Sequence, residues 1–258
     1  MVSRRPVRPD ATGAGVRSLA ALLEFEEPDV THKLQEANIP EVEPVLLDIF
    51  DRALPSAAPH RATWAVSTAR KGYSGTCAIY SPSAGGGVER TAVGEVDTVD
   101  REEGRTVRLD LLCGLSVIGA YVPNSGASLQ RLTYRVDGWD ESLRRHLEKL
   151  DGQNAVLLCG DLNAAHEDSD IWNPEDSRMP RQAGTTPEER ASFAKTLHEL
   201  GFVDAWRWQH PNAKGVYSAS LVLNIKVLDH VLGPCHGQRS LPDLVSPAFA
   251  LSGRCRCH

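Results

Sequence analysis

The sequence predicts an α/β fold whose strands form two packed sheets. Short runs of β-branched and apolar residues recur along the chain, amphipathic helical stretches alternate with them, and we find no internal repeat or linker. A chain of 258 residues can bury a core without a disulfide framework. We expect one domain over residues 15–232, preceded by a flexible basic segment over 1–14 and followed by a divergent tail over 233–258.

The elements are predicted from apolar spacing and from residues that cap or break helices. Strands are expected over 28–36, 76–80, 106–123 with glycine interruptions, and 155–159. Residues 85–87 form a glycine turn. A helix begins near Gly15, and a long amphipathic helix covers 128–150, which Gly138 divides in two. A further helix begins at Thr186, where threonine, proline and a glutamate three residues on form a capping box.

Composition narrows the class of protein. The formal net charge of −6 weighs against a protein that merely coats nucleic acid, but not against a nuclease, whose acidic metal site can lie within a basic rim. The six cysteines are irregularly spaced, which favours reduced thiols inside a cell. We expect a nuclear protein, and the basic first residues leave a mitochondrial or other organellar location as the alternative. No apolar stretch reaches the roughly 20 residues that cross a bilayer.

The strongest local signal lies at the end of the predicted strand over 155–159. Glycine follows, and then Asp161 and Asn163 stand two residues apart, so that an extended backbone puts both side chains on one face. Carboxylate and amide oxygens suit Mg²⁺ and a phosphodiester. The alternative is a strand-to-loop turn in which Asp161 caps backbone amides.

Two further strand ends carry polar groups that could bind phosphate. Glu36 ends the strand over 28–36, and Tyr121 and Asn124 end the one over 106–123. Tyrosine can donate to a phosphate oxygen, and asparagine can orient it. Each could also be an ordinary residue, Glu36 in a solvated loop and Asn124 in a turn after Pro123. Three such ends together favour a functional site, because α/β folds place function in the loops after strands.

Several segments resemble successive motifs of the exonuclease III/apurinic endonuclease family. They read LQE at 34–36, KGYSG at 71–75, AYVPNSG at 120–126, GDLNAAHEDSDIWNP at 160–174 and AGTTPEER at 183–190, and the match runs from about residue 15 to 217. The resemblance implies a four-layer α/β sandwich, incomplete at both ends here. It also implies hydrolysis of the phosphodiester 5′ to an abasic site in double-stranded DNA by a monomeric enzyme that uses Mg²⁺, or Mn²⁺.

The resemblance also assigns roles to individual residues. Glu36 would bind the metal, and Asp161 would activate or orient the attacking water. Phosphate and DNA contacts are implied for Asn163, Tyr121, Asn124, Asn173 and Tyr73. Asn173 could instead be a turn residue and Tyr73 a half-buried one. Within the same motif, Asp170 has no assigned role, and His166 reads as a loop or core histidine.

Both ends of the chain depart from the family pattern. Thr12 and Ala14 stand where the family has amides or a carboxylate beside the metal. Asp229 aligns where an aspartate orients the family's catalytic histidine, but no Ser-Asp-His motif follows it. Two alternatives to an active endonuclease therefore stay open. One is a homologue that binds DNA without cutting it, and the other is a related phosphodiesterase for lipid or sugar phosphates, which the motif over 160–174 disfavours.

Overall fold

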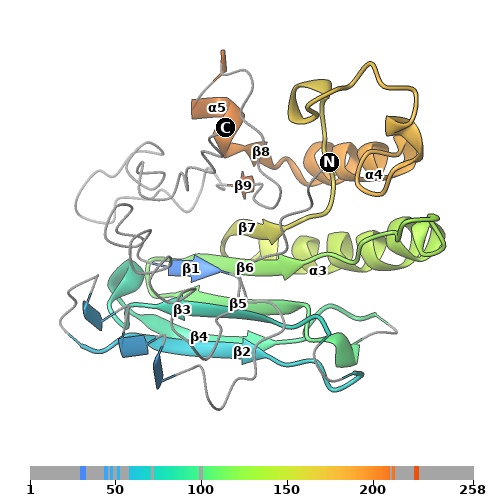
Figure 1. Ribbon diagram of the computed structural model, residues 1–258. Helices are drawn as coiled ribbons and strands as arrows, with labels where there is room; N and C mark the ends of the chain where they lie inside the picture. Colours follow the sequence, from blue (N-terminus) through green and yellow to red (C-terminus); the bar gives the residue numbers. More distant parts are fainter. Residues whose placement is uncertain are drawn as a thin grey trace.

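A computed structural model describes residues 30–32, 44–45, 47–48, 51–52, 58–70, 73–98, 101–209, 211–212 and 224–226. Glu36 and Asp229 lie outside the described residues, as do the predicted helix from Gly15 and both terminal segments. The described strands form two sheets (Figure 1).

The smaller sheet has the order β1-β3-β2 and is antiparallel. Its strands are β1 (Val30–His32), β2 (Arg61–Ala65) and β3 (Thr76–Tyr80). The larger sheet has the order β4-β5-β6-β7-β9-β8. Its strands are β4 (Val88–Val93), β5 (Thr106–Leu111), β6 (Leu115–Tyr121), β7 (Ala155–Asp161), β8 (Val203–Asp204) and β9 (Asn224–Lys226). Among the described pairs, β6 and β7 run parallel and the others antiparallel, so this sheet is mixed.

The α-helices whose bounds the structure describes are α3 (Glu141–Asp151), α4 (Pro187–Leu200) and the short α5 (Ala205–Gln209). Helices α3 and α4 lie on the side of the larger sheet away from the smaller one (Figure 1). A π-helical segment, η3 (Tyr134–Asp140), leads into α3. Single 3₁₀ turns are η1 (Ala84–Gly86), η2 (Arg101–Glu103), η4 (Asp168–Asp170) and η5 (Met179–Arg181). No helix within the described ranges is long and apolar enough to cross a membrane.

Strands β6 and β7 separate two apolar cores, because successive side chains of a strand point to opposite faces. On the helix side, Ile118 and Leu158 pack against residues of η3, α3 and α4. On the sheet side, Val117, Leu157 and Cys159 pack against residues of the smaller sheet. Beside β2, the amide and Nδ1 of His60 contact the carboxylate of Asp51, 2.6 and 2.9 Å away, which ties a helical residue to the smaller sheet.

The predicted α/β class with two packed sheets is confirmed, and so are the strand over 76–80 and the helix cap at Thr186. The prediction that the long helix begins at residue 128 was wrong. Leu129 has a φ of 58°, its amide donates to the Gly126 carbonyl at 3.0 Å, and helical residues begin at Leu132. A left-handed residue cannot continue an α-helix, so residues 125–131 form a turn instead.

Candidate active site

The ends of β6 and β7 bring two predicted site residues together. Tyr121 and Asp161 are register partners at the carboxyl ends of these parallel strands. Burial raises the pKa of Tyr121, and the nearby Asp161 carboxylate adds to the rise, while the Arg105 guanidinium opposes it. The phenol therefore keeps its proton and remains a hydrogen-bond donor.

Asp161 and Asn163 form a tight turn directly after β7. The Asn163 amide donates to Asp161 Oδ1 at 3.1 Å, and Asn163 has a φ of 47°, a left-handed conformation that asparagine tolerates better than most residues. Asn163 Nδ2 donates to the Val122 carbonyl at 2.7 Å, which anchors the turn to the end of β6. The turn and the functional site, left open as alternatives by the sequence, are therefore compatible.

Asn124 joins the same cluster from the loop after β6. Its Nδ2 donates to Asn163 Oδ1 at 3.2 Å, and its Oδ1 accepts from the Gly126 amide at 2.8 Å. The side chain is exposed. The two asparagines thus form a pair of linked carboxamides at the same strand ends as Tyr121 and Asp161.

Tyr73 is connected to this cluster through two arginines. Its hydroxyl accepts from Arg105 Nη2 at 3.1 Å and from Arg131 Nη1 at 2.8 Å. The Arg105 guanidinium also lies 4.8 Å from the ring centroid of Tyr121, and its Nη1 donates to the Tyr121 carbonyl at 3.0 Å. The carboxylate of Glu103 accepts from both arginines. Arg105 and Glu103 belong to no motif quoted from the sequence, and only their three-dimensional position links them to the site.

Three further residues of the 160–174 motif, Asn173, Asp170 and His166, have mainly structural contacts. Asn173 Nδ2 donates to Asp176 Oδ2 at 3.2 Å in a turn, so the turn interpretation has direct support and contact with DNA stays a prediction. Asp170 accepts from the Glu167 amide at 2.9 Å and pairs with Arg207 of α5. His166 is half-buried in the loop after β7 and packs edge-on against Phe193, with ring centroids 5.3 Å apart, in line with the predicted loop or core histidine.

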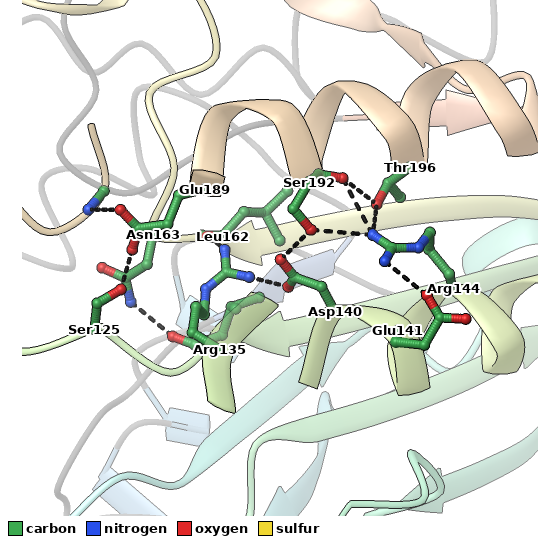
Figure 2. Close-up of polar contacts among 12 residues, drawn as sticks. Ser125, Arg135, Asp140, Glu141, Arg144, Leu162, Asn163, Glu189, Ser192 and Thr196 are labelled. Carbon is green, nitrogen blue, oxygen red and sulfur yellow. Dashed lines mark hydrogen bonds and ion pairs between the residues drawn. The ribbon is translucent and has the colours of Figure 1, made fainter. Parts of the chain in front are cut away.

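A group of buried polar side chains packs next to the turn that carries Asn163 (Figure 2). Arg135, 1% exposed, donates from Nη2 to the Leu162 carbonyl at 2.8 Å and pairs with Asp140. Burial lowers the pKa of Arg135 to about 10. Glu189 of α4 accepts from Ser125, the residue after Asn124. The sequence showed the capping role of Glu189, but not its contact with Ser125 or the role of Arg135, because both depend on packing between distant segments.

The predicted metal ligand Glu36 lies outside the described residues, as does Asp229. Within the described part of the chain, no three His, Cys, Asp or Glu side chains are grouped to hold a metal. Asp161 and the two asparagines contribute oxygen donors of the kind that Mg²⁺ prefers.

Comparison with known proteins places the chain in a family. The profile of the Endonuclease/Exonuclease/phosphatase family matches residues 8–241. An exodeoxyribonuclease from Bacillus subtilis is 38% identical over 149 residues, which cover 58% of this chain and 56% of that protein. The DNA repair nuclease APEX1 of Danio rerio is 36% identical over 160 residues, 62% of this chain and 48% of that protein. The chain spans less than two thirds of the length of these curated relatives.

Solved structures agree with this placement. The AP endonuclease LMAP from Leishmania major has a TM-score of 0.64 and 25% identity, covering 81% of this chain and 73% of that one. The 3′-5′ exonuclease NExo from Neisseria meningitidis has a TM-score of 0.58 and 17% identity, covering 82% and 81%, and it shares the fold. The chain belongs to the endonuclease/exonuclease/phosphatase family, and the resemblance of its motifs to the exonuclease III-like apurinic/apyrimidinic endonucleases is confirmed.

Proposed function

We propose that this protein is a DNA repair endonuclease that hydrolyses the phosphodiester 5′ to an abasic site in double-stranded DNA and leaves a 3′-hydroxyl. The proposal rests on one observation: hydroxyl, carboxylate and amide side chains lie together at the ends of β6 and β7. The names of relatives, a DNA-(apurinic or apyrimidinic site) endonuclease from Dictyostelium discoideum among them, support the choice of substrate.

The proposed chemistry divides among four side chains. Asp161 orients the attacking water and accepts its proton, and Asn163 binds a phosphate oxygen beside it. The Tyr121 hydroxyl donates a hydrogen bond to a phosphate oxygen, and Asn124, in the loop after the same strand, holds that phosphate. Donors fixed before the reaction stabilise the negative charge that develops in the transition state.

The surface formed by Arg131 and Tyr73, both half-buried, lies beside this cluster and suits a nucleic acid backbone. Arg131 and Tyr73 lie next to each other, and Arg105 connects Tyr73 with Tyr121. Arginine supplies charge to phosphates, and aromatic faces can contact sugars and bases. DNA held along this surface would pass the Asp161 cluster. We propose that the protein acts as a monomer on such DNA.

A divalent cation would complete the proposed site. The oxygen donors of the Asp161 turn suit Mg²⁺, or Mn²⁺, and we propose Glu36 as the residue that binds it directly. When bound, the cation would supply positive charge to the phosphate oxygens and the leaving oxygen. Binding of the phosphate would remain the task of Asn163, Tyr121 and Asn124. Asp161 would orient the attacking water and accept its proton.

The test uses the purified chain and a duplex that carries one tetrahydrofuran abasic analogue. Nicking 5′ to the analogue is expected with Mg²⁺ and not with EDTA, and a Mn²⁺ arm reports metal preference. Asp161→Asn should abolish nicking, because the amide can still accept from the Asn163 amide but cannot take a proton. The matched control is Asp97→Asn, which changes a carboxylate that is 86% exposed and pairs with Arg101.

The absent Ser-Asp-His motif favours a second candidate, a homologue that binds abasic DNA without cutting it. Tight binding of the duplex with no nicking in any metal would establish this candidate and overturn the endonuclease. Faster hydrolysis of inositol phosphates than of DNA would identify instead a phosphodiesterase for small phosphates.

A further inference from the structure

Glu189 has more hydrogen-bond donors around it than a helix cap requires. Its side chain is 0% exposed at the third position of α4. Oε2 accepts from the Thr186 amide at 3.3 Å, and Thr186 Oγ1 accepts from the Glu189 amide at 3.2 Å, which completes the capping box. Oε2 also accepts from the Gly184 amide at 2.7 Å and from Thr186 Oγ1 at 2.8 Å. Oε1 accepts from the hydroxyl of Ser125, a residue 64 positions earlier in the chain. The contact with Ser125 therefore serves something other than the start of α4.

Ser125 lies in the loop that carries Asn124. The Ser125 side chain is also fully buried, and its carbonyl accepts from the Arg131 amide at 2.9 Å. The two neighbours of Ser125 in the chain are also linked, because Asn124 Oδ1 accepts from the Gly126 amide. The turn is thus closed on itself, and the Ser125 hydroxyl joins it to the buried carboxylate of α4. Figure 2 shows Ser125 and Glu189 beside Asn163.

We propose that Glu189 is a positioning residue that acts through Ser125 to fix the exposed carboxamide of Asn124 against Asn163. This inference rests on the proposed function, in which Asn124 holds the scissile phosphate. A hydrogen bond to a buried carboxylate is stronger and shorter than one between neutral groups, so it restrains the turn firmly. Reaction rates are sensitive to such restraint, because a misplacement of about 1 Å can cost as much as 10²-fold.

Two serine variants separate positioning from general stability. Ser125→Ala removes the contact with Glu189 and leaves the capping box intact. Ser116→Ala is the matched control, because Ser116 is equally buried at the opposite end of β6 and donates to the carboxylate of Asp110 at 2.6 Å. Ser125→Ala should lower kcat for the abasic duplex about tenfold with KM changed less than about twofold, and Ser116→Ala should leave both within about twofold. Equal effects of the two variants on kcat would refute the proposal.

A double-mutant cycle tests whether Ser125 acts through Asn124. If it does, Ser125→Ala should slow the Asn124→Ala variant less than about twofold, because the side chain that the contact positions is already absent. A full tenfold additional loss would mean that Ser125 acts by another route, and the positioning of Asn124 would be excluded.

Amide hydrogen exchange measures the restraint without any activity. Ser125→Ala should speed exchange over residues 122–131 at least about tenfold, and Ser116→Ala should not. If the unaltered chain does not nick abasic DNA, the proposed function fails, and this measurement still decides whether Glu189 restrains the turn. Unchanged exchange over 122–131 in Ser125→Ala would overturn the restraint itself.

Discussion

Tyr121 keeps its phenolic proton at alkaline pH, because partial burial of the side chain and the nearby Asp161 carboxylate both raise its pKa. The Arg105 guanidinium over the ring opposes this effect, and burial prevails. A neutral phenol can donate to phosphate, whereas a phenolate would repel it. The environment of Tyr121 therefore suits a donor rather than a base.

Tyr121→Phe should lower kcat for abasic DNA by about 10²–10³-fold, since the donor to the developing charge is lost. Because the pKa of Tyr121 is raised above its ordinary value of 10.0, the rate of the unaltered chain should show no decline from this group below about pH 10. A pH profile of kcat for both proteins checks this. An alkaline limb near pH 8 that disappears in the phenylalanine variant would contradict the raised pKa.

Arg135→Met should lower the free energy of unfolding by about 3–5 kcal/mol, because it leaves the buried carboxylate of Asp140 without its cationic partner. Urea unfolding measures the change. The control Arg101→Met affects a pair in which both side chains are exposed and should cost no more than about 1 kcal/mol. Adding Asp140→Leu to Arg135→Met should restore part of the loss, and a single variant as stable as the parent would show that the pair contributes nothing.

At the scale of elements, the π-helical segment η3 decides which side chains become buried. Its bonds span five residues, and the buried pair Arg135 and Asp140 is five residues apart. An α-helix brings residues three or four apart to one face instead. Of the amphipathic helix predicted over 128–150, the buried leucines lie in α3, where Leu143, Leu147 and Leu150 are buried. Apolar spacing predicted a helix here but not its type, because the burial of the arginine depends on Leu162 and Asp140.

Thr186→Ala should destabilise the protein by about 1–2 kcal/mol, because Thr186 Oγ1 accepts from the Glu189 amide at the start of α4. Thermal unfolding followed by circular dichroism gives the change. Thr133→Ala is the matched control, since Thr133 precedes η3 without a side-chain capping bond and is exposed. Its effect should stay within about 0.5 kcal/mol. Equal effects of the two variants would argue against the cap.

In the whole molecule, the two apolar cores share strands β6 and β7 and should therefore unfold together. Both cores include residues of the larger sheet, because alternate residues of the same strands enter each of them. The single domain over residues 15–232 stays a prediction.

Leu109→Ala, in the core between the sheets, and Leu147→Ala, in the core under the helices, should each cost about 2–5 kcal/mol. Both variants should shift one common transition in urea, with tryptophan fluorescence and circular dichroism coinciding. Two separated transitions in either variant would mean that the cores unfold independently.

Features that depend on neighbours in the chain could be predicted from the amino-acid sequence. The capping box at Thr186, the strand over 76–80 and the strand before Asp161 follow from residue order and spacing alone. The grouping of Tyr121 with Asp161 was also predictable, because both end apolar strands and such ends meet at one edge of a sheet. The roles of Glu36 and Asp229 remain predictions.

The distant side chains that support the site became apparent from the three-dimensional fold. Arg105 reaches Tyr73 and Tyr121, and Glu189 reaches Ser125, across separations that no local pattern records. A buried charge needs a partner from whichever segment packs beside it, and that segment is fixed by the fold as a whole. The strand-end residues of the site could therefore be predicted from the sequence, whereas the side chains that hold them in place could not.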